Sequence, residues 1–179
     1  MSHVAPLSPV LPAPARLVGL PPVVDAGTVV LVLGSFPGVA SLRAGQYYAH
    51  PQNHFWRILQ ALWPQHPLPG PQDYAARCAW LLARGLGLWD VYGACEREGS
   101  LDSRIRHAEV NDFASLRARC PQLAAIAHNG GESFRHARAT AQLGVPMLKL
   151  PSTSPANASW SFERKRAAWA QALAAHGLL

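Results

Sequence analysis

The chain has 179 residues, 49% of them hydrophobic, and this length fits a single domain that is large enough to bury a core. Sixteen lysines and arginines against ten aspartates and glutamates give a formal net charge of +6, which favours a polyanionic partner, although a merely basic soluble protein is the alternative. No apolar run approaches the roughly 20 residues of a membrane span, and no secretory signal opens the chain. Three widely spaced cysteines without a C-x-x-C pair indicate reduced thiols, so we expect a cytoplasmic protein with no membrane partner.

The first 22 residues contain six of the sixteen prolines and show no hydrophobic period. This composition is typical of an extended arm or a disordered leader. We therefore expect residues 1–22 to form a proline-rich leader and residues 23–179 to form one domain.

Hydrophobic patterning predicts an alternation of strands and helices over that domain. Strands are expected at about 28–33, 86–92, 123–128 and 145–150, and helices at about 53–63, 72–84, 112–119, 132–141 and 162–176. Asn111 and Ser161 are the expected N-caps of the helices that follow them. The polar stretch 96–111 is expected to cross the surface. The alternation predicts an α/β fold in three α/β/α layers, with a central, mostly parallel sheet of about four strands.

The first predicted strand ends in the glycine turn Gly34-Ser35-Phe36-Pro37-Gly38, which is followed by the segment 47–56. Loops at the carboxyl ends of parallel strands hold ligands in open α/β sheets. This loop carries aromatic rings (Phe36, Tyr48), a histidine (His50) and a carboxamide (Asn53), but no aspartate, glutamate or lysine. These side chains are unusual for ordinary acid/base hydrolysis.

Cofactor and metal sites are not favoured by this segment. The Gly34-x-x-x-Gly38 spacing could cradle a phosphate, but the chain has no G-x-G-x-x-G, no P-loop lysine and no ribose-binding acid at the expected distance. His50 and His54 have the spacing of zinc ligands on a helix but no evident third ligand. We therefore expect no nucleotide or other small-molecule cofactor and no metal. The serines that follow predicted strands lack the G-x-S-x-G elbow of a nucleophile and read better as turn or cap residues: Ser35, Ser133 and Ser152.

Three motifs, each after a predicted strand, carry a resemblance to a known family. GSFPG at 34–38, QYYAHPQNHFW at 46–56 and LPSTSPANA at 150–158 resemble the uracil-DNA glycosylase superfamily, most closely its hypoxanthine-DNA glycosylase branch. The resemblance spans roughly residues 20–175. It implies a uracil-DNA glycosylase-like fold and a monomeric, nucleoid-associated enzyme that flips a deaminated base out of damaged DNA, hydrolyses the N-glycosidic bond and leaves an abasic site.

The resemblance also implies where the catalytic group lies. In pyrimidine-cutting branches the third residue of the first motif is an Asp or Asn that handles the attacking water, and here that residue is Phe36. The hypoxanthine branch places its catalytic asparagine in the HPxN segment, which corresponds to Asn53. The last motif begins with Pro151-Ser152 where some branches have a catalytic histidine. No lysine lies in the first or HPxN motif to form a Schiff base, so the resemblance implies a monofunctional enzyme.

Residues 34–38 are expected to line the base pocket, where loop N–H groups from about Ser35 to Gly38 hydrogen-bond the departing base. Phe36 is expected to stack on the base and Tyr48 to form a wall. His50 either hydrogen-bonds the base or braces the loop, and Asn129 either reads the base edge or is a plain turn residue before Gly-Gly. DNA phosphates are expected at the last loop and at outward-facing cations, unless this loop is only a capped connection. The residues concerned are Lys149, Ser152, Thr153, Ser154, Asn157, Arg164 and Lys165. Uracil removal and a non-catalytic DNA-binding module are the competing functions.

Overall fold

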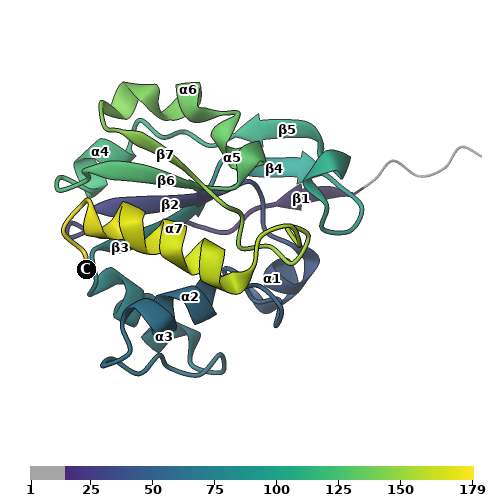
Figure 1. Ribbon diagram of the computed structural model, residues 1–179. Coiled ribbons are helices and arrows are strands. Elements are labelled where there is room, and N and C mark those ends of the chain that lie inside the picture. Colours follow the sequence, from purple (N-terminus) through teal and green to yellow (C-terminus); the bar gives the residue numbers. More distant parts are fainter. Residues whose placement is uncertain (1–14) are drawn as a thin grey trace, which may run out of the picture.

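The computed structural model describes residues 15–179 (Figure 1). A central sheet of four strands has the order β3-β2-β6-β7, and every neighbouring pair in it is parallel. The strands are β2 (Val30–Gly34), β3 (Leu86–Asp90), β6 (Ala125–Asn129) and β7 (Met147–Leu150). The predicted α/β fold with a parallel sheet of about four strands is confirmed.

The strand order explains where a ligand can bind. The chain passes from β2 to β3 on one side, and it then returns to place β6 on the other side of β2. The carboxyl edge of a parallel sheet offers a crevice at such a reversal. The turns after β2 and β6 therefore lie next to each other at this edge.

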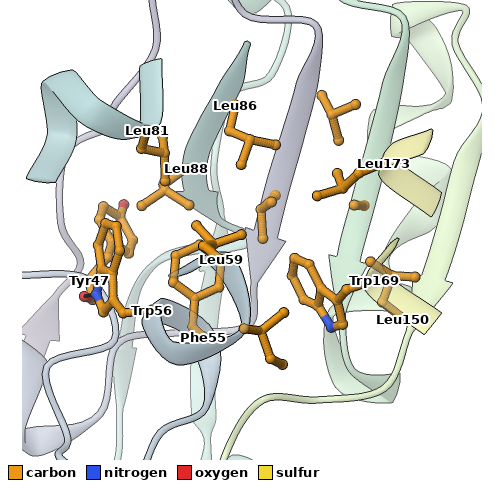
Figure 2. Packing of buried hydrophobic residues seen from close by; sticks show 14 of the residues in the cluster. Tyr47, Phe55, Trp56, Leu59, Leu81, Leu86, Leu88, Leu150, Trp169 and Leu173 are labelled. Atoms are coloured by element: carbon orange, nitrogen blue, oxygen red, sulfur yellow. Dashed lines mark hydrogen bonds between the residues drawn. The ribbon is translucent and has the colours of Figure 1, made fainter. Parts of the chain in front are cut away.

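One face of the sheet is covered by α2 (Phe55–Leu62), α3 (Tyr74–Leu82) and α7 (Phe162–Ala174) (Figure 1). All five residues of β2 are buried, as expected for a strand with helices or loops on both faces. Figure 2 shows the apolar side chains between these helices and the sheet, including Phe55, Trp56, Leu59, Leu81, Leu86, Leu88, Leu150, Trp169 and Leu173.

The opposite face of the sheet packs against the connection between β3 and β6. This connection includes β4 (Tyr92–Glu96) and α4 (Leu116–Arg119). Leu31 and Leu33 of β2 face this side, since side chains alternate along a strand. The second buried cluster also contains Phe36, Trp89, Val91, Cys95, Phe113, Leu116, Cys120, Leu123, Ile126 and Leu143.

A second, antiparallel sheet was not predicted. It has the order β1-β4-β5, in which β1 is Arg16–Val18 and β5 is Arg106–Val110. Part of the expected leader is thus a paired strand, while residues 1–14 lie outside the described residues. Part of the stretch 96–111, which was expected only to cross the surface, also forms a strand, β5. All five residues of β5 are exposed, so no buried face imposes a hydrophobic period on them.

The helices differ from the prediction in detail. The helix expected over 132–141 is two short ones, α5 (Gly131–Phe134) and α6 (Ala137–Thr140), and α1 (Val39–Ala44) was missed. Short 3₁₀ turns, η1 (Asp102–Arg104) and η2 (Ala141–Leu143), complete the elements. Among residues 15–179, no helix has both the length and the apolar character that crossing a membrane requires.

The two predicted caps had opposite outcomes. Ser161 caps α7, because its Oγ accepts the N–H of Arg164 at 3.3 Å, as predicted. The cap predicted for Asn111 was wrong. Its Nδ2 donates instead to the carbonyl of Asp90 at 2.9 Å, and α4 begins later in the chain.

Replacing Leu173 by Ala should lower the free energy of unfolding by about 2–5 kcal/mol, because the side chain is fully enclosed between α7 and the sheet. Replacing the exposed Gln171 of the same helix by Ala should change it by less than about 0.5 kcal/mol. Urea unfolding of both variants measures the difference. Equal midpoints would show that α7 does not depend on this contact.

Candidate active site

A cavity of about 460 Å³ opens at the carboxyl edge of the central sheet. This volume lies within the range of small-molecule sites. The three motif segments 34–38, 46–56 and 150–158 all contribute to its lining, and so does the end of β6. The lining includes Gly34, Ser35, Phe36, Pro37, Gly38, Tyr48, His50, Asn53, Asn129, Ser152, Ser154 and Asn157. Residues 100–103 line it as well, which the sequence did not indicate.

The first loop is held by the chain that continues from β3. The N–H of Val91 donates to the carbonyl of Gly34 at 2.9 Å, and the N–H of Tyr92 donates to the carbonyl of Ser35 at 3.0 Å. The Ser35 hydroxyl donates to Oδ1 of Asp102 at 2.7 Å. Backbone and side-chain bonds together fix the start of this loop against two other segments.

Phe36 is only 6% exposed, and it lies in the second buried cluster while also lining the cavity. The guanidinium of Arg97 lies 5.0 Å from the ring centroid and donates to the carbonyl of Pro37. Arg97 is itself buried, and this burial lowers its pKa. Within residues 15–179, the N–H groups of Phe36 and Gly38 bond to no protein acceptor. Both N–H groups therefore remain available as donors, and both residues line the cavity.

The two neighbouring tyrosines point to different places. Tyr47 is buried in the core, and its hydroxyl lies 3.1 Å from the carbonyls of both Leu20 and Pro21. Tyr48 lines the cavity, and its ring centroid lies 4.1 Å from that of Phe55. Its φ of 55° is uncommon for a bulky residue. The Tyr48 hydroxyl is buried without a partner among the described residues, and burial raises its pKa.

Asn53 lies at the entrance of α2. Its Oδ1 accepts the N–H of Phe55 at 2.9 Å, so the side chain helps to start the helix. A carboxamide oxygen can accept a second hydrogen bond, and its NH₂ can donate two. His50 lines the cavity while its Nδ1 accepts the N–H of Gln52 at 3.2 Å, a contact that braces the loop.

Asn129, at the end of β6, is clamped by Thr153. Its Oδ1 accepts the N–H of Thr153 at 2.9 Å, and its Nδ2 donates to the Thr153 hydroxyl at 2.9 Å. The asparagine is 9% exposed and lines the cavity. Both of its polar atoms keep one further hydrogen-bonding site. It is therefore a fixed polar group at the cavity wall rather than only a turn residue.

Two of the predicted DNA contacts are placed differently by the structure. Lys165 was expected to face outward, but it is 1% exposed, and its Nζ donates to the carbonyl of Ser154 at 3.4 Å. Thr153 is 0% exposed, and its hydroxyl and N–H both bond Asn129. Neither side chain can reach a phosphate from these positions. The expectation that both contact DNA directly was wrong.

The other expected DNA contacts lie at the surface or the cavity rim. Lys149 and Arg164 are exposed, and Arg164 lies over the Trp160 ring at 4.3 Å. The Ser152 and Ser154 hydroxyls accept N–H groups of their own loop, and Asn157 donates to the carbonyl of Ser152 at 3.1 Å. This loop is preformed by its own hydrogen bonds.

His50 and His54 lie in different surroundings. Over residues 15–179, no three or more His, Cys, Asp or Glu side chains come together to hold an ion. His54 packs edge-on against Phe162 at 5.4 Å, and burial lowers its pKa.

The profile of a family described as "Uracil DNA glycosylase superfamily" matches residues 21–173. The chain belongs to the uracil DNA glycosylase superfamily. It is similar to a protein named hypoxanthine DNA glycosylase from Methanosarcina barkeri, with 37% identity over 86% of this chain and 96% of that relative. A protein of the same name from Methanosarcina acetivorans is 38% identical over 82% of this chain and 92% of its own length. The family predicted from the three motifs is confirmed.

A solved structure agrees with the fold. A Methanosarcina acetivorans protein described as a candidate uracil DNA glycosylase, determined by NMR in solution, superposes with a TM-score of 0.77. The two chains are 35% identical over 92% of this chain and 99% of the other. The uracil-DNA glycosylase-like architecture is confirmed.

The glycosylase cavity also contains acids that the sequence did not reveal as site residues. Asp90 ends β3, next to Gly34 in the parallel pairing, and lines the cavity although it is 4% exposed. Burial, helped by the charge of Asp102 and opposed by Arg97, raises the pKa of Asp90 to about 8. The pKa of Asp102 is raised as well, mainly by burial. A signal for Asp90 existed, since it is a lone acid at the carboxyl end of an apolar strand.

The stability of this glycosylase should respond to pH through Asp90. The pKa of Asp90 in the folded protein, about 8, lies above its ordinary value of 3.8. The contribution of its protonated form to stability is therefore fully present below about pH 4 and is lost as pH rises toward 8. The free energy of unfolding should fall by at most about 1.4 kcal/mol per pH unit through this group. Urea unfolding at several pH values should show that Asp90→Asn removes this slope relative to wild type. Parallel curves for the two proteins would contradict the assignment.

Proposed function

We propose that this protein is a monofunctional DNA glycosylase that removes hypoxanthine from DNA by hydrolysing its N-glycosidic bond. The observation that carries the proposal is the Asn53 carboxamide at the cavity, anchored by its bond to the Phe55 N–H. Membership of the superfamily supports the glycosylase activity. The relatives named hypoxanthine DNA glycosylase, aligned over most of the chain, support hypoxanthine as the base.

The damaged nucleotide has to leave the duplex before the bond can be cut. Flipping costs a few kcal/mol and is cheapest at a damaged or mismatched base. The bond then breaks through an oxocarbenium-like sugar, so the protein has to position water and stabilise charge. Asn53 can do both, because its anchored carbonyl oxygen keeps one lone pair for the water and faces the developing cation.

Base recognition is assigned to the cavity walls. Phe36 and Tyr48 provide ring surfaces, and the free N–H groups of Phe36 and Gly38 are hydrogen-bond donors for the leaving base. Asn129 can read a purine edge with its remaining donor and acceptor, since Thr153 holds its orientation. His50 then has mainly a bracing role.

Strand cleavage is not part of the proposed reaction. The residues that line the cavity include no lysine that could form a Schiff base with the sugar. The product is therefore an intact strand with an abasic site, formed by a cytoplasmic monomer that needs no small-molecule cofactor.

Uracil removal is the second candidate. A protein from Schizosaccharomyces pombe named G/U mismatch-specific uracil DNA glycosylase is 29% identical over 58% of this chain, although over only 30% of its own length. Duplexes that contain inosine, uracil or xanthine, incubated with and without alkali, separate the candidates. Alkali-dependent cleavage at inosine supports the proposal, cleavage only at uracil favours the second candidate, and no cleavage leaves a DNA-binding module.

Replacing Asn53 by Ala should slow single-turnover excision of hypoxanthine by roughly 10²-fold or more, the effect of losing one preorganised polar group. Asn53→Ser is the matched control for the helix cap, because a serine hydroxyl can still accept the N–H of Phe55. Both variants should be slow if the amide acts on the reaction, and binding to inosine duplexes should persist.

The competing role of Asn53 is that of a cap alone. In that case Asn53→Ala loses about 1 kcal/mol of stability and keeps its excision rate. Asn53→Ser then matches the wild type in both stability and rate. A wild-type rate in either variant removes the catalytic assignment.

Charge reversal at the exposed cations Lys149 and Arg164 should weaken binding to all DNA sequences alike. Removing one cation that pairs with a phosphate should reduce the slope of log K against log salt by about one. Arg119→Glu, at the opposite end of the strands, is the matched control with the same change in net charge. Titrations at several salt concentrations measure the slope. An unchanged slope for Lys149→Glu and Arg164→Glu would place the DNA path elsewhere.

A further inference from the structure

Asp90 is an acid for which the reaction proposed above has no use. Its carboxyl lies directly over the Cα of Gly34, since a Cβ built there would be 2.3 Å from Oδ1. Oδ2 is enclosed and has no hydrogen-bond partner among residues 15–179. The side chain nevertheless belongs to the wall of the cavity, beside the loop that is assigned to the departing base.

The surroundings of Asp90 do not compensate a negative charge. The charge of Arg97 opposes the rise in the pKa of Asp90. The Arg97 guanidinium, however, donates to the carbonyl of Pro37, and its Nε and Nη1 have no partner within residues 15–179. The neighbours on the other sides are acidic or phenolic and come from the loop before α2, from α3 and from η1. They are Tyr47, Tyr48, Tyr74 and Asp102.

A carboxylate in such a place is costly, whereas a neutral carboxylic acid is much less so. A neutral acid also carries a proton that it can give away. Asp90 therefore enters the cavity as a proton donor rather than as a base. A raised pKa near 8 agrees with this protonation state at neutral pH.

We propose that Asp90 is the general acid that protonates hypoxanthine as it departs, a role that goes beyond the proposed glycosylase activity and rests on it. A purine has ring nitrogens that can take up a proton, and a neutral base leaves more easily than an anion. No histidine is available for this in the last loop, where the sequence reads Pro151-Ser152-Thr153. Asp90 reaches the cavity from the neighbouring strand instead.

The bond between C1′ and N9 breaks, and its electron pair leaves with the base. The proton on the Asp90 carboxyl moves to a ring nitrogen of hypoxanthine, so that hypoxanthine departs neutral and Asp90 becomes a carboxylate. Water positioned by Asn53 adds to C1′ and releases one proton, which restores the acid. One water is consumed, and hypoxanthine and an abasic site are formed.

The test is the single-turnover excision rate on a duplex with one inosine, measured from about pH 6 to about pH 9.5 for wild type and Asp90→Asn. Asparagine keeps the shape of the side chain but has no proton to transfer. At pH 6.5 the variant should be about 10²-fold slower, the lower end of general acid catalysis. The rate of the wild type divided by the rate of Asp90→Asn should fall about tenfold per pH unit above the Asp90 pKa. This ratio cancels the effect of ionisation of the substrate itself, which is common to both proteins.

Glu109→Gln is the matched control, because it removes a carboxylate from the exposed ion pair with Arg16 on the second sheet. Its rates should follow the wild type at every pH. Binding of Asp90→Asn to inosine duplexes should also equal that of wild type, which separates lost chemistry from lost folding.

Two results would overturn the role of Asp90. One is an excision rate of Asp90→Asn equal to that of wild type at pH 6.5. The other is a ratio of wild-type rate to Asp90→Asn rate that rises with pH, as it would if Asp90 were a general base. Either result leaves wild-type excision and its dependence on Asn53 intact. If the proposed function itself fails, the wild type releases no hypoxanthine at any pH, so the two failures are distinguishable.

Discussion

The contact between the Asp90 carboxyl and the Cα of Gly34 constrains how the first loop begins at the carboxyl edge of the sheet. A Cβ at position 34 would lie 2.3 Å from Oδ1, so any residue other than glycine there would force the Asp90 carboxyl to move. Beyond this contact the chain from β3 continues as a support, with Val91 and Tyr92 donating to the carbonyls of Gly34 and Ser35. Two adjacent parallel strands thus deliver a buried acid and a rigid loop to the same place.

This arrangement costs stability at the site. Asp90 has an enclosed oxygen without a partner, and Arg97 has two enclosed nitrogens without partners among residues 15–179. Buried polar groups in this condition destabilise a fold, and such groups concentrate at functional sites. The compensation comes from elsewhere, chiefly from the apolar layer between the sheet and α2, α3 and α7, shown in Figure 2. Packing of this apolar layer thus offsets the cost of the unpaired polar groups of Asp90 and Arg97.

The sequence predicted the parts of the molecule that follow a local rule. β2 is a continuous apolar run, the other three central strands are mostly apolar, and α2, α3 and α7 have apolar residues at helical spacing. The second sheet has no such pattern, because β5 is wholly exposed and pairs through its backbone. Lys165 looked like a surface cation between Arg164 and Arg166, yet it is buried and its Nζ donates to the carbonyl of Ser154 in the last loop. Asp90 stands out in the sequence only as a lone acid at the end of an apolar strand, because its closeness to Gly34 depends on which strands pair.

The residue that joins the three predicted loops is Thr153, which the sequence had assigned to DNA. Its carbonyl accepts the N–H of His54 at 2.9 Å, directly after Asn53, while its N–H and hydroxyl hold both polar atoms of Asn129. The two amides assigned to water and to the base are therefore positioned through one buried side chain and its backbone. Amide groups need no tuned pKa, but they act only when their orientation is fixed, because a rotated carboxamide exchanges its donor for its acceptor. Thr153 fixes the orientation of the Asn129 carboxamide, while the Phe55 N–H fixes that of Asn53, so in the proposed reaction a small hydroxyl residue in the last loop orients one amide without contacting the DNA.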